Sequence, residues 1–480
     1  MAITPATSTV PAARKQTLAT AYIDFADGSS GNDWSQQYLP DLMAKEAEVF
    51  GKRTVSGFLA QVGAEEGMAS DQVVWSEQGR LHISYKNCSS VTATGVITIG
   101  NEVDGLGSVN THAIRDGDMV IVSDGNATVK CFVIDVPSLD TITVKPYKFA
   151  DLNAAGLEDN GGATDKVVLV YGSEYIKGSV GRDGANEPGF KSFSNNPIIL
   201  KDKYEISGSD ASQIGWVEVS GEDGQNGYLW YLKAEGDTRA RFGDYLEMAM
   251  IESVKATQSF ATTQAGATGQ NMKGTEGLFA AIEARGNQSS GITGVNAATD
   301  LAEFDAILAE FDNNGAIEEN MMFVNRATAL AMDDMLASMN SYGAGGTSYG
   351  VFDNSEDMAL NLGFSGFRRG SYDFYKSDWK YLNDFGTRGA INDRDTVNAI
   401  RGVLVPAGVS SVYDETLGKN LKRPFLHVRY RASQTESRKY KTWTTGAVGA
   451  VTSDLDAMEM HFLSERCLVV QGANNFMMMK

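Results

Sequence analysis

The sequence SFSNNPIILKDKYEIS at residues 192–207 is followed, after a polar segment, by YLWYLKAEGDTRARFGDYLEMAMIESVK at residues 228–255. In the first stretch, apolar and charged side chains alternate from Leu200 to Ile206, which predicts a strand that is buried on one face. In the second, apolar or small residues recur at helical spacing from Leu229 to Ser253. Because a long helix beside a strand must bury its apolar stripe against a sheet or a neighbour, the pair predicts an α+β fold rather than a helical bundle.

Two glycines interrupt the predicted helix. Gly236 and Gly243 each cost a helix interior roughly 1 kcal/mol relative to alanine. Because both fall on the predicted apolar stripe, we expect another backbone to approach the helix closely there. The alternative is two shorter helices that are broken near Gly236, with Asp237 as the cap of the second.

The composition limits the class of protein. The 480 residues are enough for about two or three domains. The formal charge of −20 argues against extensive binding to a nucleic-acid backbone, which needs clustered Lys and Arg. Three scattered cysteines, Cys88, Cys131 and Cys467, predict a reducing cytoplasm rather than a disulfide framework. Neither a secretory signal nor a run of about eighteen apolar residues is found, so we expect no membrane segment.

Before the strand–helix pair, the sequence predicts an arm and an all-β unit. Residues 1–36 lack periodicity and predict an extended arm, and residues 38–58 predict a short surface helix. Several short strands then follow, with a hairpin turn at Asp124-Gly125, and they indicate a small barrel or sandwich. We expect this unit to lie between the two arms of one long hairpin, at about 73–85 and 167–180.

After the long helix, the sequence predicts a mixed α/β subdomain. Residues 300–311 (DLAEFDAILAEF) form the clearest amphipathic helix, which we expect to be capped by Asp300 together with Glu303 and ended by Asn314-Gly315. A strand at 320–325 and a helix at 328–339 follow. The last apolar strand, at 463–472, is expected to join the sheet nearest the long helix.

Candidate catalytic and metal-binding residues are few. Glu459, His461 and Cys467 would share one face of a continuous strand, but no residue supplies the remaining ligand of a metal site. Cys131, in an apolar run, is expected to be a core residue rather than a nucleophile. The acidic groups Asp333-Asp334 and 454–459 could do acid/base work if buried, although solvated faces explain them more simply. We expect no catalytic, cofactor or metal site.

Two glycine-bearing segments resemble ligand loops only superficially. In residues 269–275 (GQNMKGT), the lysine precedes the second glycine and no strand leads into the segment, so we expect a flexible loop rather than a phosphate loop. Residues 343–346 (GAGG) follow a predicted helix, which argues against a dinucleotide fingerprint and favours a mobile or subunit-contact loop.

Two other segments could contact nucleic acid. Residues 422–441 (KRPFLHVRYRASQTESRKYK) predict a strand with one charged face, which we expect to meet an acidic neighbouring subunit rather than nucleic acid. Residues 367–381 (FRRGSYDFYKSDWKY) carry aromatic and basic side chains that could stack on bases. Because Tyr372 and Phe374 share one strand face, core packing is the simpler interpretation.

The order of these segments resembles that of the major capsid proteins of tailed double-stranded DNA bacteriophages, which have the Hong Kong 97-type fold. SFSNNPIILKDKYEISGSDAS at 192–212 resembles the strand before the spine helix of that family, and YLWYLKAEGDTRARFGDYLEMAM resembles the spine helix itself. GTEGLFAAIEARG at 274–286 is similar to the stretch that follows. DLAEFDAILAEF, MMFVNRATALAMDDML and residues 366–379 resemble the axial domain, and FLHVRYRA with ERCLVVQG resembles the closing strands.

The resemblance implies a division of the chain. The segments are an N-terminal arm (1–36), the start of the peripheral domain with the first arm of an extended loop (37–86), an all-β insertion domain (87–165), the return arm of the loop (166–190), the peripheral domain with the spine helix (191–274), the axial domain (275–420) and the closing strands of the peripheral domain (421–480). The insertion is a departure from minimal members of the family, and capsids related to those of crAss-like phages carry additions of this kind.

The function implied by the resemblance is structural rather than enzymatic. The chain would assemble with itself into hexamers and pentamers of an icosahedral virion shell, built in the bacterial cytoplasm around double-stranded DNA that it does not bind sequence-specifically. Portal, scaffold or decoration proteins are the implied partners, with no cofactor and no membrane. The alternatives are the shell of a cellular nanocompartment with the same fold and, from another class, a glycan hydrolase with an accessory β-domain.

Overall fold

A computed structural model describes the chain at 58–59, 64–78, 82–102, 112–157, 165–181, 190–209, 219–220, 226–227, 229–258, 268–315, 317–340, 366–394, 398–407, 409–414, 419–446 and 452–480. The chain divides into two compact units, of which the second comprises Trp75–Phe193 and the first the remainder. The predicted arm at 1–36, nearly all of the helix predicted at 38–58 and the glycine loop at 343–346 lie outside the described residues.

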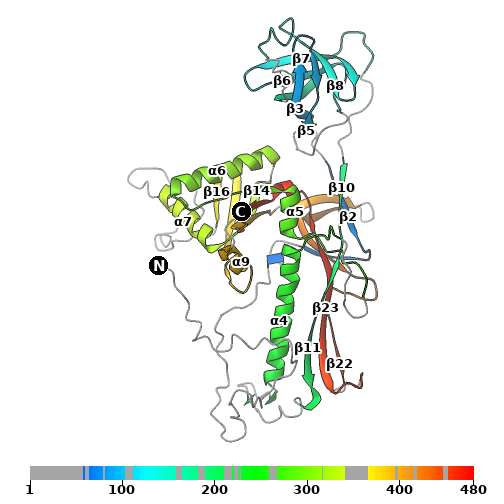
Figure 1. Ribbon diagram of the computed structural model, residues 1–480, viewed down its shortest axis with the longest axis vertical. Coiled ribbons are helices and arrows are strands. Elements are labelled where there is room, and N and C mark those ends of the chain that lie inside the picture. The colour runs from blue at the N-terminus through cyan, green and yellow to red at the C-terminus, as the bar shows by residue number, and fades with distance from the viewer. Residues whose placement is uncertain are drawn as a thin grey trace. The chain divides into compact units, whose positions relative to one another are not determined.

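The first unit contains a five-stranded sheet with the long helix packed against it (Figure 1). The sheet runs in the order β1 (Ala64–Met68), β21 (Leu426–Arg431), β23 (Ala457–Val470) and β11 (Ile198–Ser207), and β22 (Lys441–Gly446) also pairs with β23. Partly buried and exposed residues alternate along β11, as the sequence predicted. The final apolar strand begins earlier than expected, and it does join the sheet that contacts the long helix.

The long helix is continuous. Helix α4 (Leu229–Glu252) passes through Gly236 and Gly243 without a break, so the single-helix prediction is confirmed. Within the described residues the expected close approach at the glycines is not found: Gly236 is exposed, and a Cβ atom added at either glycine would meet no described atom within 4 Å. Leu246 and Met250 of the predicted stripe are buried, and Thr238 and Phe242, which the prediction left out, are buried with them, so the face that the sheet covers is only partly the predicted one.

A second, six-stranded sheet completes the first unit. Its order is β14 (Asn287–Ser289), β24 (Met477–Met479), β18 (Gly402–Pro406), β15 (Glu319–Val324), β17 (Tyr372–Asp378) and β16 (Gly366–Arg369). The associated helices are α5 (Leu278–Arg285), α6 (Ala297–Asn314), α7 (Arg326–Asn340), α8 (Lys380–Asn383) and α9 (Gly389–Arg394). Strands and helices thus share one unit, and the predicted α+β class is confirmed.

Helix α6 begins earlier than the sequence predicted. Its cap is Asn296, whose side chain accepts hydrogen bonds from the backbone of Ala298 and Thr299, so the prediction of Asp300 as the cap is wrong. Asp300 lies in the first turn, where it accepts a hydrogen bond from the backbone of Gly294. The predicted end is correct, since Gly315 has the left-handed conformation, with φ of 64°.

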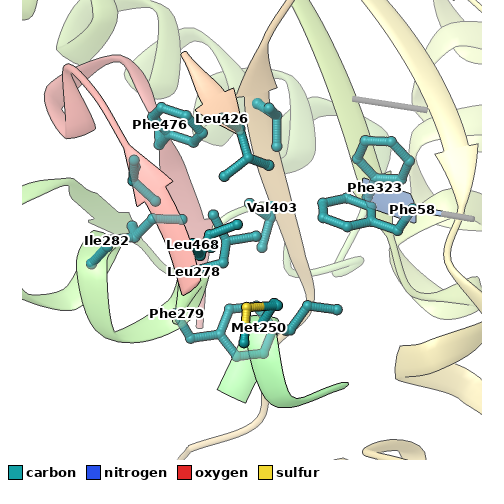
Figure 2. Close-up of a cluster of buried hydrophobic side chains, with 14 of the residues drawn as sticks. Phe58, Met250, Leu278, Phe279, Ile282, Phe323, Val403, Leu426, Leu468 and Phe476 are labelled. Atoms are coloured by element: carbon teal, nitrogen blue, oxygen red, sulfur yellow. The ribbon is translucent and has the colours of Figure 1, made fainter. Parts of the chain in front are cut away.

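One apolar core joins the two sheets of the first unit (Figure 2). Leu426 and Leu468 come from the five-stranded sheet, and Phe323 and Val403 come from the six-stranded sheet. Met250, from the last turn of α4, packs into the same cluster. The helix, the long sheet and the α/β sheet are therefore held together as one body.

The second unit is a small antiparallel barrel. Its strands are β3 (Ser84–Val91), β4 (Val96–Thr98), β5 (Asn101–Glu102), β6 (Asp118–Ser123), β7 (Thr128–Ser138), β8 (Thr141–Pro146) and β9 (Lys166–Ser173). The sheet order β4-β8-β7-β6-β9-β3 closes through pairing of β3 with β4. The predicted hairpin at Asp124-Gly125 is confirmed, with φ of 90° at Gly125.

The long hairpin predicted from the sequence does not form with the predicted pairing of its two arms. Ser84 and Tyr85 do pair with Leu169 and Val168, but both segments are strands of the barrel. Residues of β2 (Val73–Gln78) pair with β10 (Phe190–Asn195), not with the stretch that follows β9. Two further short pairs are β12 (Val219–Ser220) with β13 (Asn226–Gly227) and β19 (Val409–Asp414) with β20 (Lys419–Pro424), and a 3₁₀ turn occupies Ala473–Asn475.

Candidate functional site

The face of α4 that contacts the long sheet is aromatic. Phe242 lies 5.9 Å from the ring of Phe462 on β23 and 5.4 Å from the ring of Tyr440, measured between centroids. Leu246 joins the same cluster one turn later. This contact fixes the helix along β11 and β23, of which β23, with 14 residues, is the longest described strand.

A partly buried ionic cluster fixes the end of α4. Glu252 accepts hydrogen bonds from the Tyr381 hydroxyl, at 2.6 Å, and from Arg388, at 2.7 and 2.6 Å. The Arg388 guanidinium also lies over the ring of Phe279 on α5. Burial, with the Glu252 carboxylate beside it, raises the pKa of Tyr381 above its usual range. The helix end is therefore bonded to the segment that connects β17 and β18 of the six-stranded sheet.

The basic segment at 422–441 is neutralised by carboxylates of the same chain. Arg429 pairs with Glu66 at 2.7 Å, and Arg438 pairs with Glu465 at 2.8 Å. Arg431 also pairs with a carboxylate, that of Asp71. Carboxylates of β1, of the turn that follows it and of β23 therefore already pair with these three arginines within the chain, and the expected contact with an acidic neighbouring subunit stays a prediction.

The aromatic segment at 367–381 is largely core. Phe367 and Phe374 are buried and stack on each other with centroids 5.4 Å apart, while Phe304 of α6 packs edge-on against Phe374. Tyr372 is also buried and donates a hydrogen bond to Asp312. Core packing, rather than base stacking, is the role of these rings.

The candidate metal residues do not form a site. His461 lies 3.3 Å from Glu459, and Thr445 hydrogen-bonds with both. Cys467 is fully buried farther along β23, and burial raises the pKa of its thiol to about 12. Within the described residues, no group of three His, Cys, Asp or Glu side chains could hold a metal ion.

The other singled-out residues have structural environments. Cys131 is buried in the barrel core, and burial raises the pKa of its thiol to about 12. Asp333 pairs with Lys376, whereas Asp334 is exposed. The loop at 269–275 is held by a backbone bridge from Gly274 to Lys255 and leads into α5 without a preceding strand. None of the helices in the described part of the chain is both long and apolar enough to cross a membrane.

The barrel carries a surface groove that was not predicted from the sequence. A groove on the wall of the barrel has a volume of about 390 Å³, and Phe132 and Ile134 of β7, Tyr147 after β8 and Ile176 after β9 contribute to its lining. A related pattern is visible in β9, where Val167, Leu169 and Tyr171 are exposed although Val168 is buried, but these residues do not line the groove. A strand that is apolar on both faces, in a barrel that closes on itself, leaves apolar side chains on the outside.

Comparison with known proteins gives structural likenesses only. No protein-family model and no curated protein matches the sequence. A solved structure of Mycobacterium phage Ogopogo is similar with a TM-score of 0.42 and 9% identity, over 93% of this chain and 97% of that chain. The capsid structure of Cyanophage P-SCSP1u has a TM-score of 0.40 and 9% identity, over 92% of each chain. The mature capsid of bacteriophage PhiM1 has a TM-score of 0.38 and 8% identity, over 91% of each chain.

All three solved structures come from phages. The similarity to phage capsids that the sequence suggested is thus found again among solved structures. TM-scores below 0.5 indicate a likeness and nothing further. The function of this chain therefore has to be inferred from its own residues and elements.

Proposed function

We propose that the chain is the major capsid protein of a tailed double-stranded DNA bacteriophage, with the Hong Kong 97-type fold. The observation that carries the proposal is the continuous helix α4, which lies along the long β11–β23 sheet and is followed by a separate α/β sheet. This is the order of elements that the sequence resemblance implied. In this interpretation the barrel is an insertion domain, and the chain acts by shape rather than by catalysis.

Assembly would be into hexamers and pentamers of an icosahedral virion shell, formed in the cytoplasm of the host bacterium. Such rings bury large heterologous interfaces, which suits a chain with an extended sheet and exposed apolar side chains. Portal, scaffold or decoration proteins are the further partners proposed. An acidic inner wall would repel the packaged DNA and keep it mobile, since the chain carries a formal charge of −20.

Electron microscopy of the purified full chain, expressed alone and together with its neighbouring genes, tests the proposal. Closed shells, tubes or rings of subunits are the expected products, with sizing chromatography separating them from free chains. Shells that contain protein cargo and no DNA when isolated from the native source would favour the nanocompartment alternative. A chain that stays monomeric under every condition and hydrolyses glycans would overturn the proposal.

A further inference from the structure

The groove on the barrel wall exposes large apolar side chains. Ile176 is 85% exposed, Tyr147 49% and Ile134 47%, and all three line the groove. Phe132 and Pro146 complete its apolar floor. Contiguous apolar patches of this kind on soluble proteins commonly mark contact surfaces.

The walls of this groove are built by the barrel itself. Phe132 of β7 lies opposite Lys145 of β8 in the strand register, so both side chains stand on the outer face. The Tyr147 hydroxyl donates a hydrogen bond to Glu174 at 2.6 Å, which joins the end of β8 to the segment after β9. Desolvation and the Glu174 carboxylate raise the pKa of Tyr147 to about 12.

Lysines surround the apolar floor. Lys145 lines the groove, Lys130 stands on the outer face of β7 beside Phe132, and Lys148 and Lys177 directly follow the lining residues Tyr147 and Ile176. None of these lysines forms an ion pair with another described residue. The lining carboxylate, Glu174, is already bonded to Tyr147.

This rim contrasts with the basic residues of the long sheet. Arg429, Arg431 and Arg438 are each paired with a carboxylate of their own chain. In a chain of formal charge −20, an apolar groove beside lysines that form no ion pair within the described residues is suited to an acidic segment of another copy.

We propose that this groove binds an acidic segment with apolar side chains from a second copy of the same chain. The proposal rests on the proposed function, which gathers many copies side by side. The apolar side chains of the partner would cover Ile134, Tyr147 and Ile176, and its carboxylates would pair with the lysines of the rim. A nucleic-acid strand would use the lysines but would leave the aliphatic floor without a matching surface.

Zero-length carbodiimide cross-linking of the full chain tests the contact. Equal amounts of isotopically light and heavy chains are mixed before assembly, so that peptides that join a light and a heavy chain must be intermolecular. We expect Lys145 and Lys177 to be joined to carboxylates of another chain in the assembled or self-associated fraction. The yield should fall as sodium chloride is raised, because salt screens exposed charge pairs beyond a Debye length of about 8 Å at 0.15 M.

Substitutions in the groove and elsewhere test whether the groove, rather than the rest of the surface, makes the contact. Lys145→Glu/Lys177→Glu and, separately, Ile176→Asp should weaken self-association about tenfold or more, measured by sedimentation velocity. The matched controls are Lys201→Glu, an exposed lysine on β11, and Leu139→Asp, an exposed apolar residue of the barrel outside the groove. Both controls should associate as the unaltered chain does. Circular dichroism of every variant checks that it is folded.

The outcomes distinguish this inference from the proposed function. In assembled particles, Lys145 and Lys177 could react with an amine-reactive reagent as fast as they do in free chains. That result would overturn the groove contact and leave the proposed shell function intact. Specific cross-links in dimers that never form particles would support the contact and contradict the shell. Equal losses in groove and control variants would also overturn the groove contact.

Discussion

Lys376 on β17 and Asp333 on α7 form an ion pair that is almost excluded from solvent, with side chains 8% and 12% exposed. Replacing only the lysine, in Lys376→Met, leaves a buried carboxylate without this partner and should destabilise the first unit by about 3–5 kcal/mol. The double variant Lys376→Met/Asp333→Leu should recover much of that loss, since neither charge is then buried.

Urea denaturation of the three variants and the unaltered chain, arranged as a double-mutant cycle, measures this coupling. Arg239→Met is the control, because Arg239 pairs with Glu235 one helical turn away and is 56% exposed. The free energy of unfolding of the Arg239→Met control should fall by less than about 0.5 kcal/mol. Additive effects of Lys376→Met and the single Asp333→Leu change would contradict the coupling.

The Tyr372 hydroxyl donates a 2.6 Å hydrogen bond to Asp312 from a buried position, and burial together with that carboxylate raises its pKa to about 12. Because the pKa is higher in the folded chain than in the unfolded chain, the stabilisation is complete below about pH 10 and is lost as pH rises toward 12.

Tyr372→Phe should therefore lower the free energy of unfolding by about 1 kcal/mol at neutral pH and flatten its decline above pH 10. Tyr375→Phe, on the same strand but 52% exposed, is the matched control and should change neither quantity. Denaturant titrations at several alkaline pH values measure both. An unchanged pH slope in Tyr372→Phe would show that this hydroxyl does not control the transition.

At the scale of elements, α4 is continuous although it contains glycine at two positions that no other part of the described chain approaches. Gly236→Ala should stabilise the chain by about 0.5–1 kcal/mol, because alanine loses less backbone entropy on folding and its Cβ meets no atom. Gly274→Ala is the contrasting variant: φ there is +64°, and its Cβ would lie 2.4 Å from the Val254 carbonyl oxygen.

Gly274→Ala should therefore destabilise the chain by more than about 1 kcal/mol. Thermal unfolding of dilute, unassembled chains measures both variants. Destabilisation by Gly236→Ala in such chains would mean that a backbone does approach the helix at that turn.

The elements that the sequence revealed are those with a clear period. The alternation in β11 and the helical spacing in α4 and α6 were sufficient to predict these elements, because each element buries only one of its faces. Strand β24 was missed because Met477–Met479 is buried on both faces between β14 and β18, so three apolar residues carry no period.

The ionic partners could not be found from the sequence for a different reason. The alternation in 426–431 indicated a charged strand face, but Arg431 and its partner Asp71 are 360 positions apart. Only the parallel pairing of β1 with β21 brings such residues together. Likewise the groove of the barrel depends on which outward residues of β7 and β8 become neighbours and on the course of the segment after β9, and both are properties of the fold.

At the scale of the whole molecule, the two units have separate cores. In the described part of the chain, every buried apolar cluster lies wholly within one unit. Ile142 is fully buried in the barrel, and Ile307 of α6 is buried beside the six-stranded sheet. Since each unit has its own core, we expect two calorimetric unfolding transitions.

Matched substitutions assign the transitions. Ile142→Ala should lower the free energy of unfolding of the barrel by about 2–5 kcal/mol and its transition temperature by roughly 10 °C. Ile307→Ala should lower the transition temperature of the first unit instead. Hydrogen exchange read by mass spectrometry identifies the segment that opens in each step. If either substitution shifted both transitions equally, the units would unfold as one cooperative body, and the barrel would contribute to the stability of the whole chain rather than only to its surface.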